Sequence, residues 1–316
     1  MAPPPDSNPG LRATNPSGVP VPLVLLLALV GISFAAPLVR LSHAHPLTIA
    51  IWRLGFALVF ILGALVATGT WRQFRRLDRG GLALAAAAGI MLAFHFWSWN
   101  ASVGMTTVAA SVVLVNVQPA LVALLSGAVL AEPPTSGQWV GIVTAMFGAF
   151  VVALPDLLST AGAMTGQALT GDLLALVGAA AAAGYVIAGR RLRSVLDIWP
   201  YVSIVYGVCF VVLLIFARAV HAPILGQPPR EMGIFLALAI GPMLFGHTGI
   251  NWALKYMPAY VVNLTLLGEP VGATFLAALL PGIREIPRVA TVVGGLLVLA
   301  GILVAARSTR QRRFAL

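Results

Sequence analysis

Charged side chains are scarce in this sequence: Asp, Glu, Lys and Arg make up 9% of the 316 residues, whereas 59% are hydrophobic. A water-soluble domain carries about 25% charged residues, so the composition excludes a chain built mainly of soluble domains. Cysteine is nearly absent too. The single Cys209 excludes a disulfide framework and a cysteine-based zinc site. The composition instead predicts a polytopic membrane protein.

Several nucleotide-binding and catalytic motifs are also missing. The chain has no Gly-x4-Gly-Lys-Ser/Thr loop for ATP, no His-Glu-x2-His motif and no Gly-x-Ser-x-Gly elbow. We therefore expect neither an enzyme nor a cofactor, and no metal site. An intramembrane enzyme is the alternative from another functional class. It would need a nucleophile beside a base, such as Ser102 near His95.

Long apolar runs fill most of the chain. A helix needs about 20 apolar residues to cross the hydrocarbon core of a bilayer, and ten stretches meet this requirement. We predict an all-α integral membrane protein with ten transmembrane helices, near residues 21–41, 46–68, 80–101, 105–130, 137–155, 171–191, 198–219, 232–254, 258–280 and 287–306.

Lys and Arg are distributed unevenly between the two sides of this topology. With the N-terminus in the cytoplasm, 13 of them fall on the cytoplasmic side and 5 on the other, with Arg53 left inside a helix. Cytoplasmic loops are enriched in Lys and Arg, so both termini are predicted to be cytoplasmic in a bacterial inner (plasma) membrane. The net charge of +10 then reflects topology and contact with anionic lipid, not nucleic acid.

The two halves of the chain share a sequence pattern. Pro119 and Pro270 lie 151 residues apart, and each follows an Asn with 18 residues between them. A Glu-x-Pro-x6-Gly-x6-Gly stretch begins at Glu132 and again 153 residues later at Glu285, and each Glu is expected to cap the following helix. The predicted domains are a disordered leader (1–20), a five-helix repeat (21–155), a linker (156–170), a second five-helix repeat (171–306) and a basic tail (307–316).

Five is an odd number, so the second repeat is expected to enter the membrane upside down. Inverted repeats are typical of secondary transporters, whose substrate sites lie near the membrane midplane between the repeats. With these two units and their motifs, the chain resembles the EamA family of the drug/metabolite transporter superfamily over about residues 21–306. In the first half, Gln118 stands where the second half has Glu269 before its Pro.

The resemblance implies a ten-helix inner-membrane exporter of small metabolites without an ATP-binding unit. The aromatic third helix, FHFWSWNAS, adds a similarity to bacterial exporters of aromatic amino acids. The predicted function is therefore secondary export of small amphipathic metabolites, aromatic amino acids first, by alternating access. The alternative within transport is a facilitator or multidrug exporter for cationic aromatic compounds. Expected partners are a small-molecule substrate and membrane lipid, with monomer or homodimer left open.

The third predicted helix carries His95, Trp99 and Ser102 on one face, at i, i+4 and i+7. Such a face can stack an aromatic or cationic ligand and orient it by hydrogen bonds. The alternative is an interfacial aromatic belt with a helix–helix hydrogen bond. The predicted substrate-binding residues are His95, Trp99, Ser111, Gln118, Tyr185, His247 and Asn251.

Glu269 is predicted to lie in the middle of a helix, where ionisable groups are costly. It is the candidate for proton coupling; the alternatives are pairing with a cation, or a protonated carboxyl bonded to another helix. Pro119 and Pro270 remove backbone donors and are predicted hinges, with static kinks as the alternative. Arg53, about 10 Å from its helix end, either reaches outward to the interface or faces the pathway.

Overall fold

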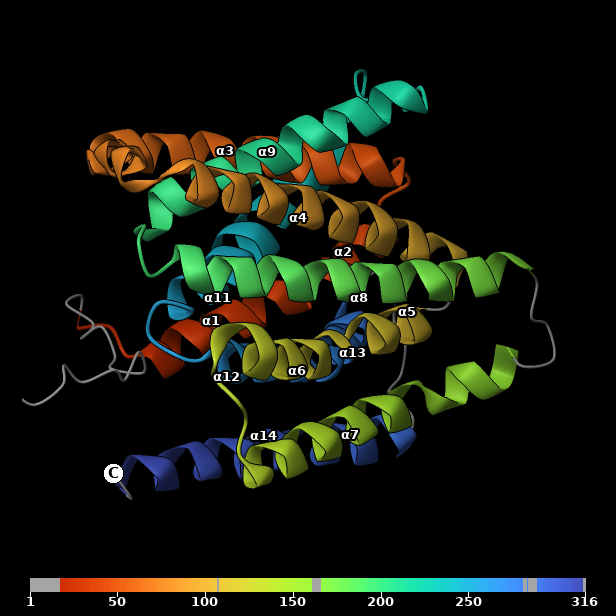
Figure 1. Cartoon of the computed structure of the whole chain (residues 1–316). Helices are drawn as coiled ribbons and strands as arrows, with labels where there is room; N and C mark the ends of the chain where they lie inside the picture. The colour runs from red at the N-terminus through yellow and green to blue at the C-terminus, as the bar shows by residue number, and fades with distance from the viewer. Residues whose placement is uncertain (1–17, 107, 161–165, 281–282, 284–288, 315–316) are drawn as a thin grey trace, which may run out of the picture.

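A computed structural model of the chain describes residues 18–106, 108–160, 166–280, 283 and 289–314 (Figure 1). All regular elements within these residues are helices, and most run roughly along a common direction. The start of the first helix and the end of the last helix lie at the same end of the bundle (Figure 1). The predicted disordered leader falls outside the described residues except for residues 18–20.

The helices of the first half follow the five predicted spans, two of which are interrupted. They are α1 (Val21–Ser33) and α2 (Ala35–Leu41), α3 (Pro46–Ala67), the 3-10 helix η1 (Thr70–Arg76), α4 (Arg79–Met105), α5 (Val108–Val115) and α6 (Gln118–Leu130), and α7 (Ser136–Thr160).

The second half follows its five predicted spans in the same way. Its elements are α8 (Gly166–Leu192), α9 (Ile198–Ala219), α10 (Pro229–Leu238), the π-helix η2 (Ala239–His247) and α11 (Thr248–Ala253), α12 (Ala259–Leu264), the 3-10 helix η3 (Thr265–Gly268) and α13 (Glu269–Leu279), and α14 (Val289–Phe314). The segment 156–170, expected to be a linker, is helical on both sides of residues 161–165, which are outside the described part. The predicted basic tail continues α14 as far as Phe314.

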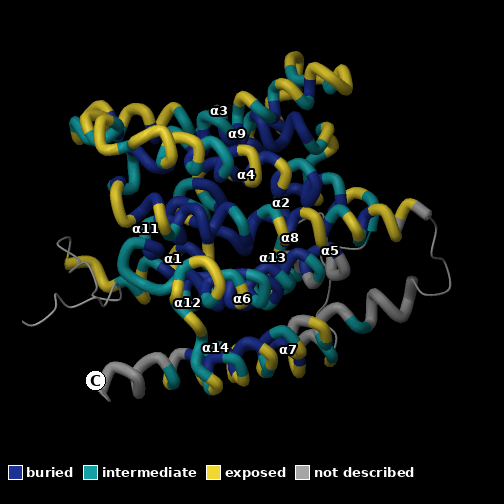
Figure 2. The backbone as a smooth tube through the Cα atoms, viewed as in Figure 1, coloured by how far each residue is buried: buried dark blue, intermediate teal, exposed yellow. Residues whose placement is uncertain are grey.

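The surface of the bundle suits a lipid environment. Among the described residues, seven helices or runs of consecutive helices are long and apolar enough to cross a membrane, and α6 and the apolar part of α14 are shorter. Large apolar side chains such as Val59 and Val66 are more than two-thirds exposed, and exposed positions gather on the outer helices (Figure 2). Water-soluble monomers rarely expose large contiguous apolar patches. The predicted all-α membrane fold is confirmed, while the count of ten spans stays a prediction.

The fourth span of each half breaks where its sequence places a proline. In the first half α5 ends at Val115, and α6 begins at Gln118 with Pro119 in its first turn. In the second half the 3-10 turn η3 separates α12 from α13, and Pro270 lies in the first turn of α13. Proline disrupts the turn before it but suits the first turn of a new helix, where no backbone donor is needed. The predicted breaks are present, and hinge motion at them stays a prediction.

The fifth helices of the two halves, α7 and α14, lie side by side (Figure 1). A Cβ atom added to Gly141 would lie 2.6 Å from the carbonyl oxygen of Gly301, and one added to Gly148 would lie 2.6 Å from that of Gly294. Only glycine permits this approach. Gly141 and Gly294 are matching repeat positions, as are Gly148 and Gly301. The contact is therefore self-complementary and antiparallel, as a two-fold axis between inverted copies requires.

The remaining helices pair between the halves in the same reciprocal way. The first span of the first half, α1, packs against η2 and α11 of the third span of the second half; conversely, α4 packs against α8. The second spans, α3 and α9, contact each other, and so do α6 and α12 of the fourth spans. The two halves are thus interleaved, and the space between them is enclosed by helices from both.

The α7–α14 contact gives a test of this packing. Replacing Gly141 or Gly301 with Leu should lower the melting temperature of the detergent-solubilised protein, because overpacking costs about 1–3 kcal/mol and the opposing backbone cannot rotate away. Gly148→Leu, at the repeat position that matches Gly301, should lose about as much stability as Gly301→Leu if the contact is two-fold. Gly63→Leu in α3 is the matched control, since a Cβ there meets nothing within 4 Å. An equal loss in the control would contradict the prediction.

Candidate functional site

A cavity of about 40 Å³ lies between the two halves of the bundle. Helices from both halves form its wall, as the inverted-repeat prediction requires of a substrate site. It brings together most of the predicted pathway residues, which come from five different spans. Those that line it are His95, Trp99, Gln118, Tyr185, His247 and Glu269.

The α4 wall of the cavity is aromatic and hydrogen-bonded. The His95 and Trp99 rings are nearly parallel, with an interplanar angle of 7° and centroids 6.4 Å apart. The Nδ1 of His95 lies 3.0 Å from the carbonyl oxygen of Gly178 in α8. A carbonyl only accepts, so Nδ1 donates and Nε2 is left as an acceptor in the neutral ring. The indole nitrogen of Trp99 is buried and has no hydrogen-bond partner among the described residues.

Gln118 and Glu269, which occupy matching repeat positions, both line the cavity but differ in their contacts. The Nε2 of Gln118 donates to Oδ1 of Asn263 over 2.7 Å, a bond that joins α6 to α12. Asn263 in turn donates to the carbonyl of Ala259 within its own helix. The buried carboxyl of Glu269 forms no hydrogen bond or ion pair with another described side chain or backbone group. Its oxygens are therefore available to a ligand.

Ser111 and Asn251 are not part of the cavity wall, and their role as ligands stays a prediction. The hydroxyl of Ser102 donates to that of Ser111 over 2.8 Å, which satisfies both. The amide nitrogen of Asn251 donates to the phenol oxygens of Tyr185 and Tyr206. Because Tyr185 lines the cavity, Asn251 positions a wall residue. Helical spacing in the sequence predicted the direction in which these side chains point. It did not predict which residues on other helices they contact.

Sequence reasoning missed two further parts of the wall, Phe96 and Asn116. Phe96 lies one residue from His95 on the adjacent stripe of α4, and its ring contacts His247 edge-on at 5.2 Å between centroids. Asn116 lies at the break between α5 and α6 and donates to the carbonyl of Val112. The signal for Asn116 in the sequence was a polar side chain near Pro119, where a helix break was predicted.

Arg53 does not reach the interface, so the outward orientation is wrong. Its side chain is 1% exposed. The guanidinium carbon lies 4.4 Å from the centroid of the Phe96 ring, and Nη2 lies 3.6 Å from the sulfur of Met243. Arg53 is therefore adjacent to the cavity, on the far side of a residue that lines it.

Two stretches of the chain, residues 20–154 and 169–307, match the profile of the EamA-like transporter family. The chain belongs to the EamA-like transporter family. It is a secondary transporter and not an enzyme. A solved structure described only as a crystal structure of a protein is similar to this EamA-like transporter, with a TM-score of 0.75 and 17% identity over 92% of this chain and 98% of that one. At that identity the likeness concerns the fold alone. No curated protein matches the sequence.

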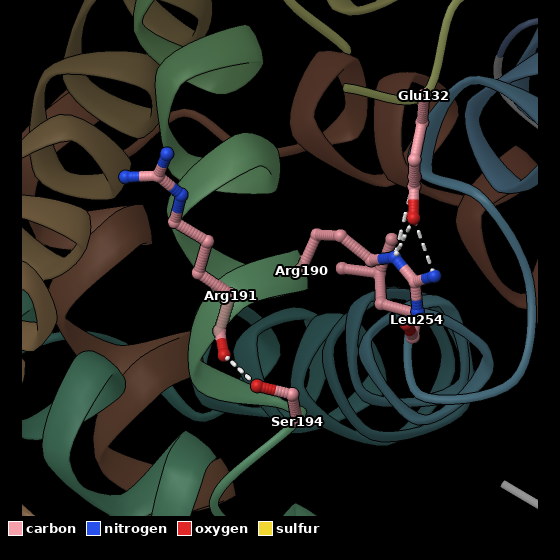
Figure 3. Close-up of polar contacts among 5 residues, drawn as sticks. All are labelled: Glu132, Arg190, Arg191, Ser194 and Leu254. Atoms are coloured by element: carbon pink, nitrogen blue, oxygen red, sulfur yellow. Dashed lines mark hydrogen bonds and ion pairs between the residues drawn. The ribbon is translucent and has the colours of Figure 1, made fainter. Parts of the chain in front are cut away.

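One end of the transporter is bridged by an arginine that contacts both halves. Arg190 at the end of α8 forms an ion pair with Glu132, 2.6 Å between Nη2 and Oε1, and Nη1 donates to the carbonyl of Leu254 after α11 (Figure 3). Glu132 was expected to cap α7. Gln138 instead accepts a bond from the Thr135 backbone there, and Glu285 lies outside the described residues.

A second bridge lies at the same end, which also holds both ends of the described chain. Lys255 pairs with Asp197 over 2.6 Å, and the Gln73 side chain of η1 donates to the same carboxylate. Partial burial works to raise the pKa of Asp197, but these hydrogen bonds and the charges of Lys255 and Arg193 hold it below its ordinary value. Asp197 is therefore ionised at neutral pH and keeps the bridge.

The opposite end of the transporter is bridged as well. Ser42, after α2, donates to the carboxylate of Glu231 in α10, and Arg230 pairs with that carboxylate. The indole nitrogen of Trp52 donates to the carbonyl of Ile224 over 2.9 Å. In this arrangement hydrogen bonds join the two halves at both ends of the cavity.

The role of Asn251 behind the wall can be tested by stability. Asn251→Leu should lower the melting temperature in detergent, because the buried hydroxyls of Tyr185 and Tyr206 lose a partner, at a cost of about 1–3 kcal/mol. Asn116→Leu is the matched control, since the side chain of Asn116 donates to the carbonyl of Val112 within its own helix turn. A larger loss for Asn116→Leu would contradict the assignment.

Proposed function

We propose that this transporter exports small amphipathic metabolites, aromatic amino acids first, across the inner membrane by alternating access. The observation that carries the proposal is the composition of the cavity wall. The His95 and Trp99 rings offer surfaces on which an aromatic side chain stacks. Across the same cavity Glu269, with no partner among the described residues, suits an α-ammonium group, because charge-assisted hydrogen bonds are the strongest.

The proposed topology is ten spans in two inverted repeats with both termini in the cytoplasm. The glycine contact between α7 and α14 and the reciprocal pairing of the other helices support the inversion. The position of both chain ends at one end of the bundle supports an even number of crossings (Figure 1). The excess of Lys and Arg at that end supports a cytoplasmic location for it.

Alternating access would have to enlarge the cavity. Its volume of about 40 Å³ is well below the roughly 150 Å³ of an engineered cavity that binds benzene. The bridges of Arg190 and Lys255 at one end, and of Glu231 at the other, would then open in turn. Helix breaks offer places to bend: those before Pro119 and Pro270, and the π-helix η2 around Pro242. Such irregular turns are frequent at functional sites.

The second candidate function is transport of cationic aromatic compounds, such as viologen-type molecules. The same rings attract a cation through their faces, and Glu269 would neutralise its charge. Both candidates place a positive charge at Glu269. They differ in a second substrate group, because an amino acid also carries a carboxylate and a cationic drug does not.

Uptake by proteoliposomes tests the proposal. Vesicles that contain the purified protein should take up labelled Phe or Trp faster than empty vesicles. Trp99→Leu should slow this uptake about tenfold, because a ring contact is worth about 0.5–1.5 kcal/mol beyond its buried area. Trp71→Leu is the control, since Trp71 lies in η1 and is 46% exposed. Rates equal to those of empty vesicles would refute amino acid transport, and competition by a viologen-type cation would compare the two substrate classes.

Glu269→Gln tests proton coupling. Gln is the residue that the first half already has at the matching position, so the shape of the site should survive. If Glu269 carries the proton, uptake driven by a pH gradient should fall at least tenfold while exchange of Phe against Phe continues. Asp78→Asn removes an exposed carboxylate before α4 that belongs neither to the cavity wall nor to the bridges, and it should retain the gradient dependence. A Glu269 variant with unchanged flux at every gradient would exclude coupling through this residue.

A further inference from the structure

Arg53 is a buried cation whose hydrogen-bonding capacity is largely unused. It lies in the interior of α3, and its Nε and Nη1 atoms have no hydrogen-bond partner among the described residues. Its contacts are the sulfur of Met243, a weak acceptor, and the ring of Phe96. None of the ion pairs between described residues includes it.

The groups around the guanidinium do not supply the missing anion. Glu269 lies within electrostatic range but not in contact, and Tyr206 and Cys209 are the other acidic groups near it. His95 and His247 also feel its charge and cannot balance it. A guanidinium stays protonated in proteins, and a buried unpaired charge costs several kcal/mol. A buried cation without a partner is expected where a ligand of opposite charge binds to it.

Phe96 links this cation to the cavity wall. The Phe96 ring lines the cavity and also contacts the guanidinium. The cavity must enlarge before it holds an aromatic molecule, and displacement of the Phe96 ring would join the space around Arg53 to it. An anionic group of the ligand would then meet a free donor, Nε or Nη1. Each of these forms a planar fork with Nη2, whose contact with the Met243 sulfur is weak, and such a fork suits a carboxylate.

We propose that Arg53 binds a carboxylate of the transported molecule, so that the substrate class is aromatic carboxylic acids, including amino acids, and not purely cationic aromatic compounds. This inference rests on the proposed transport function and adds the charge of the substrate to it. The carboxylate binds at Arg53, and an ammonium group, where the substrate has one, faces Glu269.

A ligand series on the unaltered protein tests the proposal without any variant that might misfold. The purified transporter is heated in detergent with L-phenylalanine, 3-phenylpropionate, L-phenylalaninamide or 2-phenylethylamine. The first two carry a carboxylate, whereas the last two do not. The two carboxylates should raise the melting temperature with half-saturating concentrations at least tenfold below those of the other two. Equal protection by the amide or the amine would overturn the proposal, and so would protection by none of the four.

Variants locate the effect at Arg53. In Arg53→Gln the ratio of half-saturating concentrations for phenylalaninamide and phenylalanine should fall from at least ten to about one, and Arg53→Lys should keep part of it. Arg190→Gln, a charge removed at the end of the bundle, should keep the whole ratio. A ratio within one variant does not depend on that variant's stability. An unchanged ratio in Arg53→Gln would overturn the assignment; if that variant does not fold, the ligand series decides.

Two further measurements, a chloride titration and an uptake assay, distinguish failure of the Arg53 assignment from failure of the proposed transport function. Chloride titrated alone should protect only weakly; protection equal to that by 3-phenylpropionate would make Arg53 an inorganic anion site and overturn the proposal. Uptake of labelled 2-phenylethylamine in preference to phenylalanine would leave transport intact and refute the role of Arg53. Carboxylate binding without flux of any ligand would support Arg53 and refute the proposed transport function.

Discussion

The rest of this structure depends on one constraint. The bilayer core holds no water, so a polar side chain inside the bundle must find a hydrogen-bond partner within the protein. Most buried polar groups near the cavity meet it. Gln118 binds Asn263, Asn251 binds two tyrosines, and His95 binds the carbonyl of Gly178. Near the cavity, Trp99, Arg53 and Glu269 have unused capacity. Buried polar atoms without a partner also occur away from the cavity wall, among them Oδ1 of Asn100, Oγ of Ser126 and the hydroxyl of Tyr201. The candidate site is therefore the place where unused polar capacity meets a cavity.

The two halves share a scaffold but not a site. Gly141 and Gly301 each abut the backbone of the other's helix, so neither tolerates a side chain. Cavity residues meet no such restriction, and the matching positions carry an amide in Gln118 and a carboxyl in Glu269. A pair of equivalent carboxylates would repel each other across this small space. A single carboxyl opposite an amide avoids that cost and makes the pathway asymmetric.

Sequence patterns predicted the helical elements better than they predicted the contacts between side chains of different helices. Run length and proline position follow from local physics, so the helical segments and the breaks before Pro119 and Pro270 agree with the structure. Glu132 was misassigned because its partner, Arg190, is 58 residues away, and no local rule favours that pair over a helix cap. Likewise, helical spacing showed that Asn251 points inward but not that two tyrosines intervene. The burial of Arg53 depends on which helices pack against α3. Its distance from the end of its own helix does not reveal this.

Charge balance links Arg53 and Glu269 to the charge of the substrate. A zwitterionic substrate would place its carboxylate near Arg53 and its ammonium near Glu269, which leaves the net charge of the site unchanged. A cation would compensate Glu269 and leave Arg53 unpaired, at a cost increased by the low dielectric of the interior. Moving one positive charge out of a cell that is negative inside also costs about 2.3 kcal/mol per 100 mV. A zwitterion carries no net charge across that potential, so the proposed export through a site with one buried cation and one buried carboxyl favours a zwitterion over a cation.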